Sequence, residues 1–237
     1  MSGQSGPVLP YETPGGGGLR FDRAFVSGHG KAIVLMVMVG AATLFHCVAV
    51  GTDFAQVHLL QRIKMHLPLF PGEARQNDLR VNMVSGAAML LTIGGMVFWL
   101  IWLYRVYCNL TPLNGRPSKH TPGWAVGGFF IPIYNLAHVP MVMNELWNES
   151  DPAESRGGLL VTCWWILWIA AGILERIGSL LKTPIHPGGR PTVDSLISMS
   201  WLFVIAHVVL IVAGLLAIWL VWGIDDRQRR KSRLVQV

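Results

Sequence analysis

Four long apolar runs divide the chain, and each is long enough to cross a lipid bilayer. They cover residues 32–52, 81–107, 158–181 and 195–222. A membrane-spanning helix needs about 20 mostly apolar residues, because the hydrocarbon core of a bilayer is about 30 Å thick. The pattern therefore predicts an all-α membrane protein whose four transmembrane helices form one domain over residues 31–224.

A fifth apolar region, residues 123–148, is interrupted by Pro132 and Pro140. Proline has no backbone N–H and cannot continue an undisturbed helix, so we expect the backbone to break at both positions. Each remaining piece is too short to cross, and broken backbone is not tolerated where it faces lipid. The pattern predicts a Pro-broken re-entrant or interfacial segment between the second and third spans.

The regions outside the spans differ in composition. Residues 1–30 are rich in Gly, Ser and Pro, which predicts a disordered tail. Residues 53–66 mix apolar and basic positions, which is typical of a helical extension or of a helix lying on the membrane surface. Within the second span, Gly86, Gly94 and Gly95 would let a neighbouring helix approach closely.

Composition supports a membrane protein and argues against nucleic acid as a partner. Only 14% of the residues are charged, against about 25% in an ordinary soluble domain. The net charge is +6, and five of the 19 Lys and Arg residues lie in residues 225–237, a basic tail that we interpret as an anchor beside anionic lipid. The lipid bilayer is therefore the expected partner, and the lone Cys47, Cys108 and Cys163 indicate neither disulfides nor a zinc site.

The distribution of Lys and Arg predicts the orientation of the four spans. With four crossings and both termini in the cytoplasm, twelve basic residues lie inside and seven outside. If the broken segment also crossed, the basic tail would lie outside, against the positive-inside rule. We therefore expect an inner-membrane protein with cytoplasmic N- and C-termini.

Polar residues in and beside the broken segment are the first candidates for function. Ionisable groups at membrane depth are costly and often mark sites, so Arg105, Asn135 and Glu145 could face a polar cavity and bind a ligand. The alternative is local: Arg105 pairs with Glu145, and Asn135 satisfies backbone broken at Pro132.

The segment also resembles a known family. The pattern includes Arg105, Asn109, Pro122-Gly123-Trp124, Phe130 to Leu136, Pro140, Met143, Glu145-Leu146-Trp147 and Ser150. It is similar to domain of unknown function 4328, a set of bacterial multi-pass membrane proteins with no assigned activity. The resemblance implies a four-span inner-membrane protein and supplies no catalytic residues. Our candidate binding residues are Arg105, Asn109, Trp124, Asn135, Glu145 and Trp147.

Histidines in the spans raise a competing idea, a haem held by His46 and His207. Counted from the expected outer ends of their spans, they lie about 6 and about 12 residues deep, a mismatch of about 9 Å. Axial ligands of one haem need matched depth, so the pattern favours ordinary buried histidines. We expect His58 and His66, with Asp53 nearby, to be solvated.

No catalytic motif with recognisable spacing occurs in the sequence, which predicts neither an enzyme nor a cofactor or metal site. Two classes of function stay open. One is a small membrane binding or permeation module built around the broken segment. The other is a structural or regulatory subunit that binds another membrane protein or associates with itself.

Overall fold

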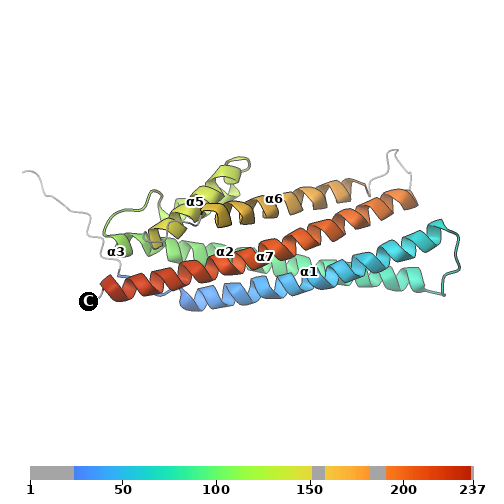
Figure 1. Cartoon of the computed structure of the whole chain (residues 1–237), viewed down its shortest axis with the longest axis horizontal. Helices are drawn as coiled ribbons and strands as arrows, with labels where there is room; N and C mark the ends of the chain where they lie inside the picture. Colours follow the sequence, from blue (N-terminus) through green and yellow to red (C-terminus); the bar gives the residue numbers. More distant parts are fainter. Residues whose placement is uncertain (1–23, 151–157, 182–190, 236–237) are drawn as a thin grey trace, which may run out of the picture.

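The computed structural model describes residues 24–150, 158–181 and 191–235, and within those ranges it contains helices and no strand (Figure 1). The elements are α1 (His29–Lys64), α2 (Glu73–Cys108), α3 (Leu110–Asn114), α4 (Pro122–Gly127), the short 3₁₀ helix η1 (Gly128–Phe130), α5 (Tyr134–Ser150), α6 (Gly158–Leu180) and α7 (Val193–Val235). The predicted all-α class is confirmed.

Four of these helices, α1, α2, α6 and α7, are long and apolar enough to cross a membrane, as predicted. Three are longer than the predicted spans, because they continue beyond the apolar core into polar sequence. The 36 residues of α1 extend roughly 54 Å at 1.5 Å per residue, well beyond a hydrocarbon core of about 30 Å. Residues 53–64 are part of this helix, so the helical-extension alternative holds for them and there is no separate surface helix.

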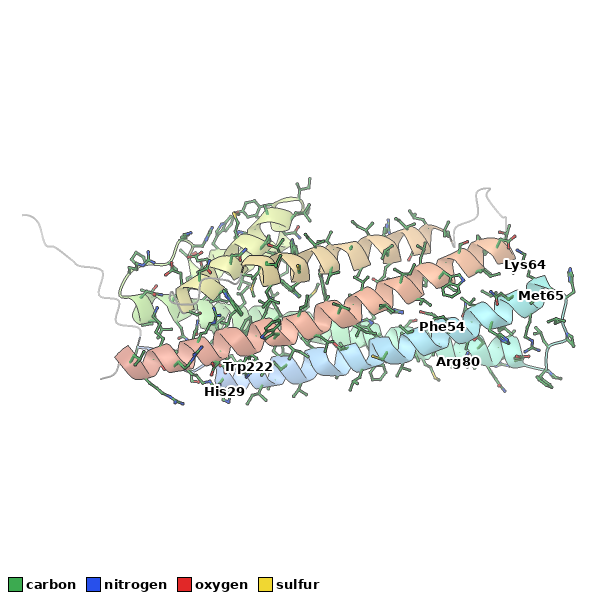
Figure 2. All side chains as sticks on the ribbon, viewed as in Figure 1. His29, Phe54, Lys64, Met65, Arg80 and Trp222 are labelled. Carbon is green, nitrogen blue, oxygen red and sulfur yellow. The ribbon has the colours of Figure 1, made fainter. Side chains whose placement is uncertain are left out.

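The helices form an elongated bundle in which α1 packs against both α2 and α7, and α6 packs against α7 (Figure 1). Polar contacts align the two ends of α1 with α7. Lys64 lies 2.6 Å from Asp194, and His29 lies 2.7 Å from Asp225. His29 and Lys64 are at opposite ends of the bundle (Figure 2). The described N-terminal and C-terminal ends of the chain therefore lie at the same end.

The glycines of α2 behave differently from one another. A Cβ at Gly94 would lie 2.8 Å from the Met38 side chain, so α1 does approach α2 closely there. A Cβ at Gly86 or Gly95 would meet no heavy atom within 4 Å. The expected close helix contact is wrong at those two positions. The open space beside Gly95 is part of a cavity between the helices.

Both expected tails are partly built into the bundle. The basic region 225–237 continues α7 as helix to Val235, and Asp225 and Gln228 in it are buried. Residues 1–23 of the expected N-terminal tail lie outside the described residues. Val26, in its remaining part, is held by hydrogen bonds to α2.

The largest cluster of buried side chains lies where α5 packs among α2, α6 and α7. Its fully buried members include Trp102, Leu103, Tyr107, Met143, Leu146, Leu220 and Ile224. This core is at the end of the bundle that holds both ends of the described chain. The broken segment is therefore an integral part of the core.

Candidate functional site

The broken segment is a hairpin. The helix α4 begins at Pro122, where Thr121 caps it by accepting a hydrogen bond from Trp124 N at 3.2 Å. The chain then turns between η1 and α5, and Ile133 at the turn has a positive φ of 65°. The predicted break at Pro132 is confirmed.

The hairpin dips among the spans before it returns. Trp165, the eighth residue of α6, donates a hydrogen bond from its indole to Leu136 O at 3.0 Å. This contact lies roughly 10 Å along α6 from its first residue, at 1.5 Å per residue. Of the two alternatives left open by the sequence, the contact supports the re-entrant one. Residues 122–150 are called the re-entrant hairpin below.

Side chains satisfy backbone carbonyls that the break leaves without helical partners. Asn135 Nδ2 donates to Phe129 O at 3.3 Å, and His138 Nε2 lies 3.3 Å from Ala125 O. The His138 ring packs so closely on Gly128 that a Cβ there would overlap it. Backbone groups at membrane depth need such internal partners. Asn135 therefore has the local role that the sequence analysis offered as an alternative to ligand binding.

The expected break at Pro140 is wrong, because α5 runs through this position. In a regular helix, residue 140 would donate its N–H to Leu136 O, and proline cannot. The indole of Trp165 supplies the missing donor to that carbonyl. A side chain from the next span thus compensates the proline, and the helix continues.

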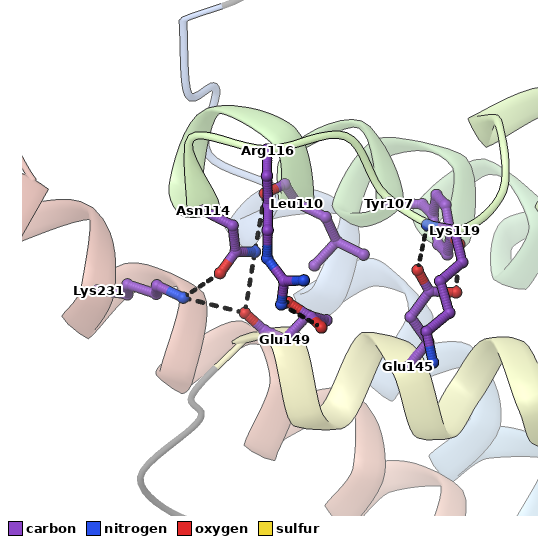
Figure 3. A network of polar contacts seen from close by, with 8 residues as sticks. All are labelled: Tyr107, Leu110, Asn114, Arg116, Lys119, Glu145, Glu149 and Lys231. Carbon is purple, nitrogen blue, oxygen red and sulfur yellow. Dashed lines mark hydrogen bonds and ion pairs between the residues drawn. The ribbon is translucent and has the colours of Figure 1, made fainter.

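Glu145 is engaged by α2 and by the loop that precedes the hairpin. Its carboxylate accepts hydrogen bonds from Tyr107 Oη at 2.6 Å and from Lys119 N at 2.7 Å (Figure 3). It also lies 3.2 Å from His120 Nδ1. The side chain is 3% exposed. A buried carboxylate with several donors is locally satisfied and needs no ligand.

Arg105 and Asn109 hold the segment that precedes α1. Arg105 donates to Val26 O from Nε at 3.1 Å and from Nη2 at 3.0 Å, and Asn109 Nδ2 donates to the same oxygen at 3.0 Å. Asn109 Nδ2 also donates to Gln228 Oε1 on α7 at 3.1 Å. The two side chains therefore join the N-terminal segment, α2 and α7.

The expected grouping of Arg105, Asn135 and Glu145 is therefore not formed. Each has its own partners, and the proposed ion pair between Arg105 and Glu145 is replaced by the contacts just described. Arg105 and Glu145 are the opposite charges nearest the break in the sequence, which is why they were expected to pair. In the fold, a backbone carbonyl lies closer to Arg105, and a tyrosine hydroxyl lies closer to Glu145.

The two tryptophan candidates also pack locally. Trp124 is partly exposed, with its ring centroid 6.1 Å from that of Tyr134 in the same hairpin. Trp147 is buried on α5, and the guanidinium carbon of Arg227 lies 3.7 Å from its ring centroid. This geometry is a cation–π contact between the hairpin and α7.

The end of the hairpin is fastened to α3 and α7. Arg116 Nη2 lies 2.8 Å from both carboxylate oxygens of Glu149 (Figure 3). Asn114 Nδ2 donates to Glu149 O at 3.2 Å, and Lys231 Nζ donates to Asn114 Oδ1 at 2.5 Å. These contacts return the hairpin to the end of the bundle from which it started, so it does not cross.

A cavity of about 240 Å³ lies among the four spans, and the hairpin forms part of its wall. The wall is mainly apolar and aromatic. Its residues are Val39, Ala42, Thr43 and His46 of α1; Leu91, Thr92, Gly95, Met96, Trp99 and Leu100 of α2; Trp164, Trp165, Trp168 and Ile169 of α6; Leu210 and Ala217 of α7; and Phe129 and Asn135 of the hairpin. Asn135 is the one candidate binding residue in this wall.

Two buried ring nitrogens in the cavity wall have no hydrogen-bond partner among the described residues, His46 Nδ1 and Trp99 Nε1. The two residues are 8% and 9% exposed. Trp99 stacks on Trp164 with ring centroids 4.9 Å apart. An unpartnered buried donor is unfavourable by about 1–3 kcal/mol. Both nitrogens are buried within the protein, so other atoms of the two side chains form the cavity surface.

The histidines of the spans lie together, contrary to the expected mismatch in depth. The ring centroids of His46 and His207 are 5.3 Å apart, and His207 Nδ1 lies 2.9 Å from Asp53 Oδ2. The expectation failed because α1 does not end near residue 52: it continues to Lys64, so the end of the bundle lies farther out. Asp53 is buried in this pair, whereas His58 and His66 are exposed, as expected.

Two features could not be predicted from the sequence: the cavity, and the series of contacts from Asp53 to His207 and from His207 to His46. One signal was present: residues 46 and 53 are seven apart, which puts them on one face of a continuous helix. The contact with α7 could not be obtained from that spacing. No group of three His, Cys, Asp or Glu side chains suited to a metal ion occurs in the described parts of the chain.

These features define a four-span, all-helical membrane protein with a re-entrant hairpin and a partly open cavity between its spans. The family model "Domain of unknown function (DUF4328)" matches residues 67–226, and the chain belongs to this family. The match covers α2 to most of α7, whereas α1, with His46 and Asp53, precedes it. Comparisons with curated proteins and with solved structures give no match.

Proposed function

We propose that the protein is a membrane binding module that holds a lipid-soluble molecule in the cavity between its spans. The observation that carries the proposal is the cavity itself, with its apolar and aromatic wall and the side chain of Asn135 at its hairpin end. Ligand sites are typically apolar hollows with a few polar groups that fix orientation. Sites for drug-sized ligands measure about 300–1,000 Å³, so a cavity of about 240 Å³ suits a single ring or part of an acyl chain.

The positions of the polar residues favour a binding protein over a permeation path. A permeation path needs polar groups along a continuous route. Here Arg105, Asn135 and Glu145 are engaged with backbone or neighbouring side chains. The proposal assigns the protein a binding role and no reaction.

The re-entrant hairpin would close one end of the cavity. Phe129 and Asn135, on either side of its turn, line the cavity wall. The hairpin end of the bundle also holds both ends of the described chain, and we place this end in the cytoplasm of a cell with the protein in its inner membrane. The larger share of Lys and Arg on that side supports the orientation.

The test uses a bromine-bearing alkane, 1-bromododecane, which quenches tryptophan fluorescence on contact. Four tryptophans line the cavity, Trp99, Trp164, Trp165 and Trp168. The full chain in detergent micelles is titrated with the alkane as wild type, as Gly95→Leu and as Gly86→Leu. Both glycines lie on α2, and a Cβ added at either would have no heavy atom within 4 Å, but only Gly95 lines the cavity.

Wild type and Gly86→Leu should show a quenching component that saturates, and Gly95→Leu should lack it because the leucine side chain fills the cavity. Quenching that rises without saturation and is equal in all three proteins would contradict the proposal. That result would favour a structural subunit that binds another membrane protein.

A further inference from the structure

The cavity is elongated along the helices. Its wall follows α1 from Val39 to His46 and α2 from Leu91 to Leu100, which are distances of roughly 11 and 14 Å at 1.5 Å per residue. Membrane-spanning helices are tilted on average only about 20° from the bilayer normal, so the cavity runs nearly parallel to the surrounding acyl chains. A single flat ring would fill only part of this length. The empty remainder would be unfavourable, because its wall would lose packing contacts.

The cavity lies at the middle of the spans. Ala42 and Thr43 line it, and both are at the centre of the apolar run 32–52 on α1. The surface of the hydrocarbon core is about 15 Å from its centre. A lipid headgroup stays at that surface and does not reach the cavity. The part of a lipid that lies at this depth is the distal half of an acyl chain.

The cavity opens sideways between α2 and α6. The helix α2 packs against α1, and α6 packs against α7, but α2 and α6 are not a closely packed pair. The stacked rings of Trp99 and Trp164 join them at the hairpin end of the cavity. Beside the open space at Gly95, the side chain of Met96 in the wall is 53% exposed. A chain of a neighbouring lipid can therefore enter from the bilayer without passing through water.

A helix of a partner protein is too wide for the cavity. A helix with its side chains is about 10–12 Å across, so even one turn of it occupies more than about 400 Å³. The cavity has a volume of about 240 Å³. Its occupant must be narrower than a helix, and acyl chains are the narrow apolar groups that surround the spans.

Polar side chains of the wall are bonded to the backbone of the protein. The hydroxyls of Thr43 and Thr92 each donate to a carbonyl of their own helix, at 2.8 and 2.9 Å. Asn135 Nδ2 donates to a carbonyl of the hairpin at 3.3 Å. Because these donors are already used, the wall favours hydrocarbon over a polar ligand. A ring could still use the indoles of Trp164 and Trp168, so the test includes a ring probe.

We propose that the cavity holds the distal part of one acyl chain of a bilayer lipid, which enters between α2 and α6 while its headgroup stays at the membrane surface. This inference rests on the proposed function, because it names the ligand class of the same cavity. The bound molecule is then part of the surrounding bilayer, and it exchanges with the bilayer sideways.

The experiment places the full chain in nanodiscs of a phosphatidylcholine that carries bromine on one acyl chain, either near the methyl end or near the headgroup. Bromine quenches tryptophan fluorescence on contact, so the two lipids report which part of the chain touches the tryptophans. The proteins are wild type, Gly95→Leu, which fills the cavity, and Gly86→Leu. Gly86 is the matched control, because it is an exposed glycine on the same helix outside the cavity wall.

With bromine near the methyl end, wild type and Gly86→Leu should be quenched more strongly than Gly95→Leu. The difference should be about a tenth of the total emission for each cavity tryptophan that the chain touches, because the protein has 10 tryptophans. With bromine near the headgroup, the three proteins should be quenched alike. If Gly95→Leu does not fold, Thr92→Leu, which adds volume to the same wall one turn away, should give the same result.

Equal quenching of wild type and Gly95→Leu by both lipids would overturn this inference. Saturable quenching by 1-bromododecane in micelles would then leave the cavity as a site for a free molecule, and saturable quenching by 1-bromonaphthalene would identify a ring site. Absence of saturable quenching by both free probes would overturn the proposed function as well.

Discussion

The hydrogen bond from Trp165 to Leu136 O explains why α5 continues through Pro140, and a double-mutant cycle tests that explanation. The two changes are Trp165→Phe, which removes the indole donor, and Pro140→Ala, which restores the backbone N–H. In the wild-type protein, Trp165 Nε1 donates a hydrogen bond to Leu136 O at 3.0 Å. In Pro140→Ala the helix would supply its own donor to Leu136 O.

The expected magnitudes follow from these contacts. Trp165→Phe should reduce the free energy of unfolding by about 1 kcal/mol for the lost hydrogen bond, in addition to a packing loss. Interhelical hydrogen bonds in membranes average about 0.6 kcal/mol, so the effect should lie near this lower range. In the Pro140→Ala background the hydrogen-bond part should vanish, because the carbonyl keeps a partner. The packing loss is common to both backgrounds and cancels in the cycle.

The assay is reversible unfolding in mixed detergent micelles, followed by helical circular dichroism for the four proteins. A coupling energy of about 0.5–1 kcal/mol between the two positions would support the compensation. Trp165→Phe with the same effect in both backgrounds would refute it, and Pro140 would then be tolerated for some other reason. Pro140→Ala alone should stabilise the protein, since proline in a helix interior is unfavourable by about 3 kcal/mol or more.

Two further predictions concern the packing of the bundle. Glu145→Gln should destabilise the protein by about 1–3 kcal/mol in the same assay. The amide oxygen can keep the bond from Lys119 N, but the Tyr107 hydroxyl must then turn to accept from the amide, and its bond to a charged carboxylate is lost. Arg116→Ala, at an exposed ion pair, should change stability by less than about 1 kcal/mol. Gly214→Ala should destabilise by about 1–3 kcal/mol, because the added methyl group would overlap the Thr43 side chain on α1. A neutral Gly214→Ala would mean that α1 and α7 are less closely packed.

The four spans and the break at Pro132 could be predicted because both depend on local sequence. Apolar length decides whether a helix can cross, and proline decides where a hydrogen bond is lost. The local role of Asn135 was one of two alternatives from the sequence, because a nearby polar side chain commonly satisfies broken backbone. These features need no knowledge of how the helices are arranged.

Every feature that could not be predicted from the sequence depends on contacts between distant segments. Pro140 continues a helix because Trp165, on the next span, donates to the carbonyl that it leaves free. Asp53 is buried because α7 brings His207 against α1. Glu145 meets Tyr107 of α2, whereas Arg105 meets the chain before α1.

The cavity was hidden from the sequence for a related reason. Its volume depends on how far α2 stands from α6, and apolar length does not fix the tilt or spacing of helices. Gly95 was expected to bring a neighbour close, yet a Cβ added there would have no heavy atom within 4 Å. Its position could be recognised as part of a cavity wall only after the helices were placed.

The most direct test of the central claim is an experimental structure of the wild-type protein in nanodiscs of its own membrane lipids, compared with Gly95→Leu. The claim predicts density for a bound molecule in the wild-type cavity, in contact with His46 and Trp99, and its absence from the variant. A wild-type structure in which α2 and α6 close together, with no cavity and with Trp99 Nε1 bonded to the protein, would contradict the account.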